Sequence, residues 1–243
     1  MMALEWTSLF NPNPTVSTID LFDGQICVVL DDVLNEPDRL VAWASSRGPF
    51  TPPSYPYPGL VADIPHPLLA AASNHFDRML RDRLGYRRQT ESLVRLSLMQ
   101  QAASALRPIQ WLCHRDRIAA DPSRTGFAAS VLYLFHDPAL GGTDFYRPKQ
   151  SPAETDQLIA DSQRLDATSF SKRYGLTGGY MAPDNPYFEH IARVPAAWNR
   201  LIAYDGGVFH SAAVDSSTPL HADPTRGRLT LNGFYTCTRP LRS

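Results

Sequence analysis

The stretch ESLVRLSLMQ, residues 91–100, alternates small or apolar side chains with polar ones and decides the fold class. Successive side chains of a β-strand point to opposite faces, so Val94 and Leu96 would lie on one face while Arg95 and Ser97 lie on the other. This period of two predicts a strand that carries Leu93, Arg95, Ser97 and Met99 on one face and Val94, Leu96 and Leu98 on the other.

Strand-like segments of this kind recur to the end of the chain without regular helical segments between them. They are PIQWLCHRD (108–116), FAASVLYLF (127–135), GGTDFYR (141–147), NRLIAYDG (199–206) and RLTLNGFYT (228–236). A run of strands that follows a run of helices is typical of an antiparallel sheet or barrel with helices packed to one side. The predicted class is therefore mainly β with flanking helices (α+β).

The region before residue 89 has a different pattern, with two predicted helices and one strand. The apolar segment 25–30 predicts a strand, and Asn35 would cap a helix that ends near Ser46. From Pro67 to Leu84 apolar residues recur at helical spacing, which predicts a longer helix. The prolines between residues 47 and 66 predict an extended connection. We expect one domain, with helical support over about 1–88 and a β core over about 89–240.

Composition excludes several functional classes. The 243 residues carry 23 Lys and Arg against 24 Asp and Glu, so bulk positive charge cannot drive nucleic-acid binding. No apolar run approaches the roughly 20 residues that span a bilayer, and the first residues lack the basic and apolar regions of a signal peptide. Three cysteines without CxxC spacing argue against a disulfide framework or a zinc knuckle. These features predict a cytoplasmic protein without membrane or nucleic-acid partners.

The most informative motif is His114-Arg115-Asp116. In extended backbone, residues i and i+2 point to the same side, so His114 and Asp116 would face one cavity. His210 follows 94 residues after Asp116, at the end of the apolar segment LIAYDGGVFH. Two histidines and one carboxylate form the facial triad that binds non-haem Fe(II) with open coordination positions. A second HxD sequence, His221-Ala222-Asp223, lies in a turn-rich loop with no later histidine.

A second group of candidate residues lies downstream of His210. On a strand, Arg228 and Thr230 share a face that points inward, and Tyr133 would add a hydroxyl from a neighbouring strand. A buried arginine requires an anion, and the guanidinium fork matches a carboxylate. Arg226 is the better candidate for a surface ion pair.

The order of these features resembles the 2-oxoglutarate- and Fe(II)-dependent dioxygenases, in particular the prolyl-4-hydroxylase-like branch. The resemblance rests on His114-Arg115-Asp116, Tyr133-Leu134 with Gly141-Gly142-Thr143, Arg200 to Tyr204 before His210, and Arg228-Leu229-Thr230. The resemblance covers about residues 90–238. It is strongest for a bacterial subgroup whose substrates are unassigned. Phe135 replaces the usual Asn after Tyr-Leu, and the 18 residues from His210 to Arg228 exceed the usual spacing, so Arg226 stays an alternative to Arg228.

The resemblance implies a double-stranded β-helix (jelly-roll) core. It also implies that His114, Asp116 and His210 bind Fe(II), while Arg228, Thr230 and Tyr133 hold the cosubstrate 2-oxoglutarate. O2 would be the second cosubstrate, and a small molecule, peptide or protein would be hydroxylated. Halogenating relatives lack the carboxylate that Asp116 supplies, so hydroxylation is expected. Two alternatives stay open: a zinc or iron enzyme of hydrolytic or cupin type that does not use 2-oxoglutarate, and a non-catalytic module that binds a carboxylate or a protein.

Residues 151–198 form an expected insertion between two strands of the core. Its first half has a helical pattern and its second half, GLTGGYMAPDNPYF, is irregular. A segment this long at the mouth of a barrel would shape the substrate pocket as a lid. His190 within it is a candidate for the substrate side of the pocket. The other histidines, His66, His75 and His136, are expected at the surface or on helix flanks.

Overall fold

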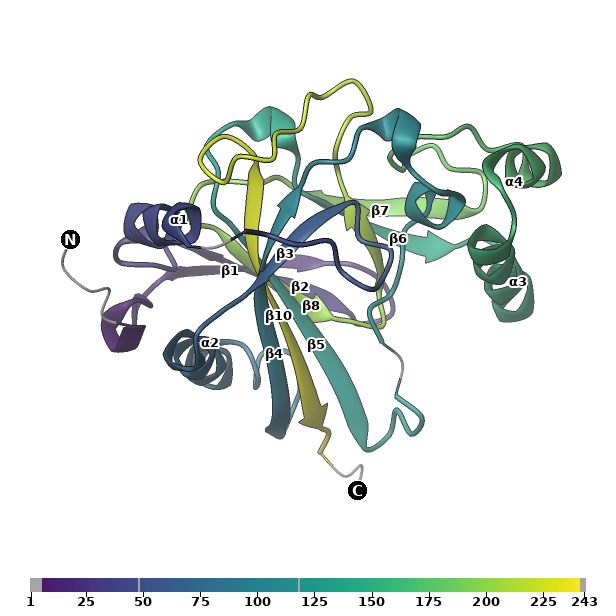
Figure 1. The fold of residues 1–243 in the computed structure, drawn as a ribbon. Coiled ribbons are helices and arrows are strands. Elements are labelled where there is room, and N and C mark those ends of the chain that lie inside the picture. Colours follow the sequence, from purple (N-terminus) through teal and green to yellow (C-terminus); the bar gives the residue numbers. More distant parts are fainter. Residues whose placement is uncertain (1–5, 48, 118, 241–243) are drawn as a thin grey trace.

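Two antiparallel sheets form the centre of the molecule in the computed structural model, which describes residues 6–47, 49–117 and 119–240 (Figure 1). The larger sheet has the strand order β1 (Thr15–Asp20), β2 (Ile26–Asp31), β8 (Leu201–Asp205), β5 (Thr125–Tyr133), β10 (Arg228–Thr238), β4 (Arg88–Met99) and β3 (Gly59–Asp63). The smaller sheet has the order β7 (Phe188–Val194), β6 (Thr143–Pro148) and β9 (Phe209–Ala212).

The chain passes back and forth between these sheets. It runs from β4 in the larger sheet to His114, which bridges to β9 of the smaller one, and then returns to β5. Strands β6 and β7 belong to the smaller sheet, β8 to the larger, β9 to the smaller and β10 to the larger. This is the strand order of a double-stranded β-helix, or jelly roll. The predicted fold class is confirmed.

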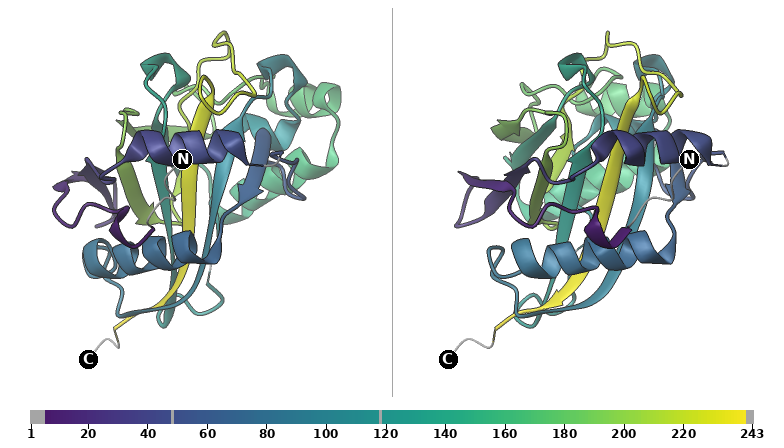
Figure 2. Two further views of the ribbon diagram at one scale, coloured as in Figure 1. Left: turned by 60° about the vertical axis from the view of Figure 1, so that its left-hand side comes forward. Right: turned by 90° about the vertical axis from the view of Figure 1, so that its left-hand side faces the viewer.

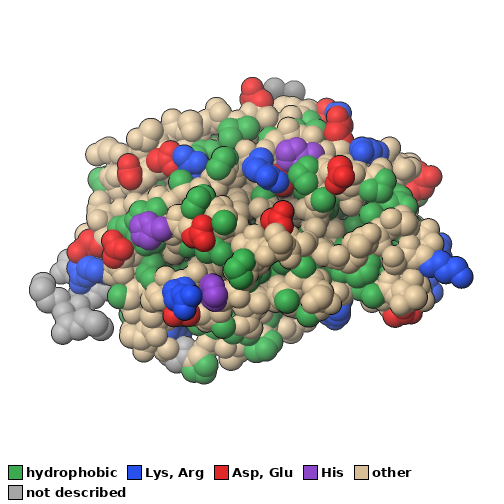
Figure 3. All heavy atoms as spheres, turned by 90° about the horizontal axis from the view of Figure 1, so that it is seen from above, with side chains coloured by type: hydrophobic (Ala, Val, Ile, Leu, Met, Phe, Trp, Pro, Cys, Tyr) green, Lys and Arg blue, Asp and Glu red, His purple; other side chains and the backbone are tan. Residues whose placement is uncertain are grey.

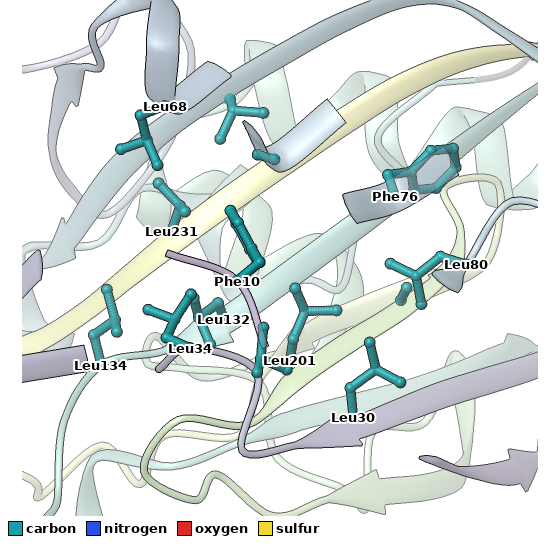
Figure 4. Packing of buried hydrophobic residues seen from close by; sticks show 14 of the residues in the cluster. Phe10, Leu30, Leu34, Leu68, Phe76, Leu80, Leu132, Leu134, Leu201 and Leu231 are labelled. Carbon is teal, nitrogen blue, oxygen red and sulfur yellow. The ribbon is translucent and has the colours of Figure 1, made fainter. Parts of the chain in front are cut away.

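Helices α1 (Pro37–Ser46) and α2 (His66–Met79) cross the outer face of the larger sheet (Figure 2). Their buried faces pack on the apolar side of the central strands, and the contact includes Leu68 and Phe76 of α2, Leu132 of β5 and Leu231 of β10 (Figure 4). Burial of large apolar side chains on this face supplies the main stabilisation of the fold. Strand β4 contributes Val94, Leu96 and Leu98 to this face, one of the two sets that the alternation of residues 91–100 separates.

Two details of the predicted helices are wrong. Helix α1 begins after Glu36, because the Asn35 side chain donates a hydrogen bond to the Ser8 carbonyl, at 2.8 Å, and so caps no helix. Helix α2 ends at Met79 instead of Leu84, since the backbone N–H groups of Leu80 and Arg81 both donate to the Phe76 carbonyl and the chain then turns.

The region 151–198 contains both helices and a core strand. Helices α3 (Pro152–Arg164) and α4 (Ala167–Tyr174) confirm the helical pattern, and Ser151 and Glu154 form a capping box at the start of α3. They pack beside the smaller sheet through Leu158 and Phe170 (Figure 1). The prediction of one insertion is wrong at its end, because β7 pairs with β6 and completes the smaller sheet.

Two predicted strands differ from the structure. Residues 108–111 form a short 3₁₀ helix, and only His114 of PIQWLCHRD pairs as a strand residue. The segment LIAYDGGVFH is two strands in different sheets, β8 and β9, because the chain turns at Gly206 and Gly207. Further 3₁₀ helices cover Trp6–Ser8, Ala103–Ala105 and Pro138–Leu140.

The surface has no dominant charge on the face that Figure 3 shows, where acidic and basic side chains are scattered among neutral ones. This distribution agrees with the net charge of −1. No helix among the described residues is long and apolar enough to cross a membrane.

Candidate metal centre

Backbone hydrogen bonds place the HxD segment against β9. The His114 N–H donates to the His210 carbonyl at 2.9 Å, and the His210 N–H donates to the His114 carbonyl at 2.8 Å. The Asp116 N–H donates to the carbonyl of Gly206, at 2.8 Å, in the turn between β8 and β9. Main-chain contacts therefore fix His114 beside His210, which follows it 96 positions later in the chain.

The three predicted ligands converge on one point. The His114 Nε2 lies 3.7 Å from Asp116 Oδ1, and His210 Nε2 lies 3.6 Å from Asp116 Oδ2. One ligand atom from each of the three residues lies within 4.8 Å of the others. Among the described residues, this is the cluster of His, Cys, Asp or Glu side chains that could hold a metal ion.

The surroundings of His210 favour its role as a metal ligand. Burial lowers the pKa of His210 to about 4, so the imidazole is neutral at physiological pH. Its Nδ1 lies 2.9 Å from the Val208 carbonyl, which can only accept, so the proton resides on Nδ1 and Nε2 has a free lone pair. A hydrogen bond from the second ring nitrogen to a carbonyl is the usual way in which proteins orient a ligating histidine.

One oxygen of the Asp116 carboxylate has no bonding partner among the described residues, and a metal ion could take that place. Its Oδ2 atom is buried and accepts no hydrogen bond from the described residues, and burial raises the pKa of the group. An uncompensated buried carboxylate oxygen is costly, and a divalent cation between it and two neutral imidazoles removes that cost. The residues present therefore fit Fe(II) or another divalent metal of this ligand preference.

The ligands open into a deep cleft of about 1130 Å³ between the two sheets. Single ligand pockets commonly measure about 300–1,000 Å³, so this space can hold more than one small molecule. The wall formed by the larger sheet includes alternate residues of β10, namely Arg228, Thr230, Asn232 and Phe234. These are the side chains that face away from α1 and α2.

Arg228 is a buried cation without a carboxylate partner among the described residues. Only 5% of it is exposed, and its Nε and Nη2 donate to the carbonyls of Leu140 and Gly142, each at 2.9 Å. Those contacts orient the guanidinium but do not neutralise it. Gly141 has a φ of 77°, and a Cβ there would meet the Ala213 carbonyl oxygen at 2.1 Å, so this arginine-orienting loop requires glycine. Arg226 is exposed in the preceding turn.

The other predicted cosubstrate residues lie around Arg228. Thr230 lines the cleft directly. The Tyr133 hydroxyl lies 2.8 Å from the Thr143 hydroxyl, and Thr143 lines the cleft. Tyr57 and Tyr180 also line the cleft, although no sequence pattern predicts them there. Tyr57 belongs to the proline-rich connection, where no periodic pattern marks which side chains turn inward, and burial raises its pKa to about 12.

Two histidines lie elsewhere than predicted. His190 lies outside the cleft, with its Nε2 3.0 Å from Asp144, whose carboxylate also accepts two hydrogen bonds from Arg193. His75 is buried on α2 rather than exposed, and its ring stacks on Phe10 with centroids 4.6 Å apart. Burial lowers the pKa of His75 to about 4.

A family model covers residues 12–235 of the chain, and its description is a family of unknown function, DUF6445. The chain belongs to this family. No curated protein sequence matches the chain.

Solved structures with a similar fold share little sequence with this DUF6445 member. HygX from Streptomyces hygroscopicus, with nickel and 2-oxoglutarate bound, is 10% identical over 89% of this chain and 84% of its own, with a TM-score of 0.49. A Pseudomonas putida prolyl-4-hydroxylase is 15% identical over 88% of this chain and 92% of its own, with a TM-score of 0.40. An N-substituted L-amino acid dioxygenase from Burkholderia ambifaria is 11% identical over 88% and 86%, also with a TM-score of 0.40.

Proposed function

We propose that this protein is an Fe(II)- and 2-oxoglutarate-dependent dioxygenase that hydroxylates an amino-acid residue, a peptide or a small metabolite. One observation supports this most: the unneutralised cation of Arg228 lines the same cleft as the triad of His114, Asp116 and His210. A metal site alone fits many enzymes. A metal site that shares a cleft with a buried guanidinium fits a cosubstrate that both chelates a metal and carries a distal carboxylate.

In this proposal each side chain has a distinct task. His114, Asp116 and His210 would hold Fe(II), and all three side chains line the cleft from which a cosubstrate would approach. Arg228 pairs with the distal carboxylate of 2-oxoglutarate, and Thr230 adds a hydroxyl beside it. Tyr133 acts through Thr143, whose hydroxyl it contacts, and so helps to orient the polar lining of this end of the cleft.

Fe(II) with bound 2-oxoglutarate supplies the activation of O2, coupling oxidative decarboxylation to succinate and CO2 with oxidation of the substrate. The protein itself contributes orientation and exclusion of water. The buried Val208 carbonyl keeps His210 in the ligating tautomer, and the buried rings of Tyr204 and Phe145 pack around that imidazole, with centroids 4.7 and 6.5 Å away. Such packing holds a ligand in place and keeps competing water away.

Succinate formation tests the proposal directly. Purified protein with Fe(II), 2-oxoglutarate and O2 should form succinate slowly even without the primary substrate, and His210→Ala should abolish this turnover. Metal-dependent turnover of another kind without succinate would indicate the hydrolytic or cupin-type alternative. Carboxylate binding without any turnover would indicate a binding module.

A further inference from the structure

Arg95 on β4 is a second cation in the cleft, and it forms no ion pair or hydrogen bond with an acidic side chain among the described residues, although its positive charge opposes the rise in the pKa of Asp116. Its guanidinium lies between two aromatic rings, 4.4 Å from the centroid of Tyr55 and 4.8 Å from that of Phe234. Its Nε is buried and donates no hydrogen bond within the described part of the chain. The two rings hold the guanidinium in place and leave its Nε–H without an acceptor in that part of the chain, which is an arrangement suited to an incoming anion.

The residue opposite Arg95 also has an unpaired polar atom. Asn232 on β10 pairs in register with Arg95, and its Oδ1 is buried without a hydrogen-bond donor among the described residues. Its Nδ2 is already used, since it donates to Ser97 at 3.2 Å. Arg95, whose Nε–H lacks an acceptor among the described residues, is thus paired in register with Asn232, whose Oδ1 lacks a donor among them. A ligand with a carboxylate and a neighbouring N–H group would satisfy both.

The strand register separates this pair from the proposed cosubstrate site. On β10, Arg228 lies opposite Met99 and Asn232 lies opposite Arg95. Four residues of strand correspond to about 13 Å. The cleft therefore has two cationic positions along one strand ladder, one at the buried Arg228 and one at the half-buried Arg95.

The rim beside Arg95 is apolar. Tyr55 and Leu93 are large hydrophobic side chains with 37% and 52% of their surfaces exposed, and both line the cleft. Exposed apolar side chains that border a cleft are typical of a surface that a ligand covers. The rim would contact an apolar group attached to the anion.

We propose that Arg95 and Asn232 bind the primary substrate through a carboxylate with an adjacent N–H donor, as in an N-acylated amino acid or the C-terminus of a peptide. The catalytic meaning of this site rests on the proposed dioxygenase function. The binding of the anion does not, because the residues of the site are not metal ligands.

The test compares two molecules that differ in one charge. N-acetyl-L-phenylalanine carries the carboxylate, the N–H group and an apolar ring, and N-acetyl-L-phenylalanine amide lacks only the negative charge. Calorimetric titrations would use the protein saturated with Mn(II) and 2-oxoglutarate without O2. The wild-type protein should bind the acid at least tenfold more tightly than the amide. In Arg95→Gln the two affinities should become equal within about twofold.

Two further variants separate this site from general positive charge. Asn232→Asp places a carboxylate opposite Arg95 and should also abolish the preference for the acid. Arg117→Gln removes another cation that lines the cleft, stacked on Phe127, and should keep the preference within threefold of wild type. Equal binding of acid and amide to wild type, a preference that persists in Arg95→Gln, or an equal loss in Arg117→Gln would each overturn the proposal.

Failure of the dioxygenase assignment would be visible separately. If 2-oxoglutarate does not bind the Mn(II)-loaded wild type, the proposed function is wrong, and the same acid and amide titrations on the protein without cosubstrate still decide the role of Arg95. If 2-oxoglutarate binds normally to Arg95→Gln and the acid preference is lost, the two anion sites are distinct.

Discussion

The two faces of the larger sheet differ in how completely their side chains are paired. Toward α1 and α2 the strands present buried apolar residues such as Leu96, Leu229 and Leu231. Toward the smaller sheet the same strands present Arg95 and Arg228, which form no ion pair with a carboxylate of the described residues, and Asn232, whose Oδ1 accepts no hydrogen bond from them. Strand β10 contributes to both faces at alternate positions. Alternate positions of one strand therefore have different roles: the side chains on one face stabilise the fold, and those on the other face are available to bind ligands.

The largest expected effect is the loss of the metal site. His210→Ala should reduce the stoichiometry of Fe(II) or Mn(II) from one to zero, because two ligands are left around an open cleft. Equilibrium dialysis under anaerobic conditions measures this. His221→Ala, in the second HxD sequence of the chain, is the matched control and should keep one bound ion. An unchanged stoichiometry in His210→Ala would remove the triad assignment.

The second largest effect should be a difference in the free energy of unfolding between variants on the two faces of β10. Leu231→Ala removes a fully packed side chain beneath α2 and should lower the free energy of unfolding by about 2–5 kcal/mol, with metal binding intact. Thr230→Ala, one residue away on the cleft face, should cost less than half as much. Urea titrations of both variants give the comparison. Equal losses would mean that the two faces contribute alike to stability.

A third prediction concerns Arg228. Arg228→Ala should weaken 2-oxoglutarate binding at least tenfold, since a charge-assisted contact in a buried site contributes about 1.5–3 kcal/mol. Metal stoichiometry should stay at one. Arg226→Ala is the control and should bind 2-oxoglutarate within twofold of wild type. Loss of affinity in Arg226→Ala but not in Arg228→Ala would show that Arg226 binds the cosubstrate and would contradict the role of Arg228.

The smallest effect should be a pH dependence of the stability that arises from His75, which is buried between α2 and the larger sheet. The pKa of His75 is lowered from 6.5 to about 4 by burial, so the unfolded chain takes up a proton there at a higher pH than the folded protein does. His75 therefore favours the folded state above pH 6.5, and this contribution is lost as the pH falls from 6.5 toward 4. His75→Leu should show a smaller drop in urea midpoint between pH 7.5 and 4.5. An identical drop would mean that His75 is solvated.

The sequence predicted most of the cleft because strand alternation and motif order are local signals. His114 and Asp116 share a side through their i, i+2 spacing, and Arg228 and Thr230 through theirs. The turn at Gly206 and Gly207, which moves His210 into the other sheet, could not be predicted from the apolar pattern of LIAYDGGVFH. The pairing of β7 with β6 was missed because a short strand after irregular chain gives a weak signal.

Long-range pairs account for the remaining errors. The sequence makes His190 a candidate for the substrate side, yet its partner Asp144 lies 46 positions earlier on the neighbouring strand. Nothing local in PYFEHIARV indicates that pairing. The inward position of Tyr57 likewise depends on how a proline-rich connection folds over β4, and such segments have no period to interpret.

The most direct test of the central claim is an anaerobic calorimetric titration of 2-oxoglutarate into metal-free and Fe(II)-loaded protein. We expect one molecule of 2-oxoglutarate to bind per chain in the Fe(II)-loaded wild type. Binding should be at least tenfold weaker without metal, because the metal and Arg228 hold opposite ends of one cosubstrate. An affinity that does not change with metal, or no binding in the loaded protein, would contradict the claim that this cleft is built for a metal-chelating dicarboxylate.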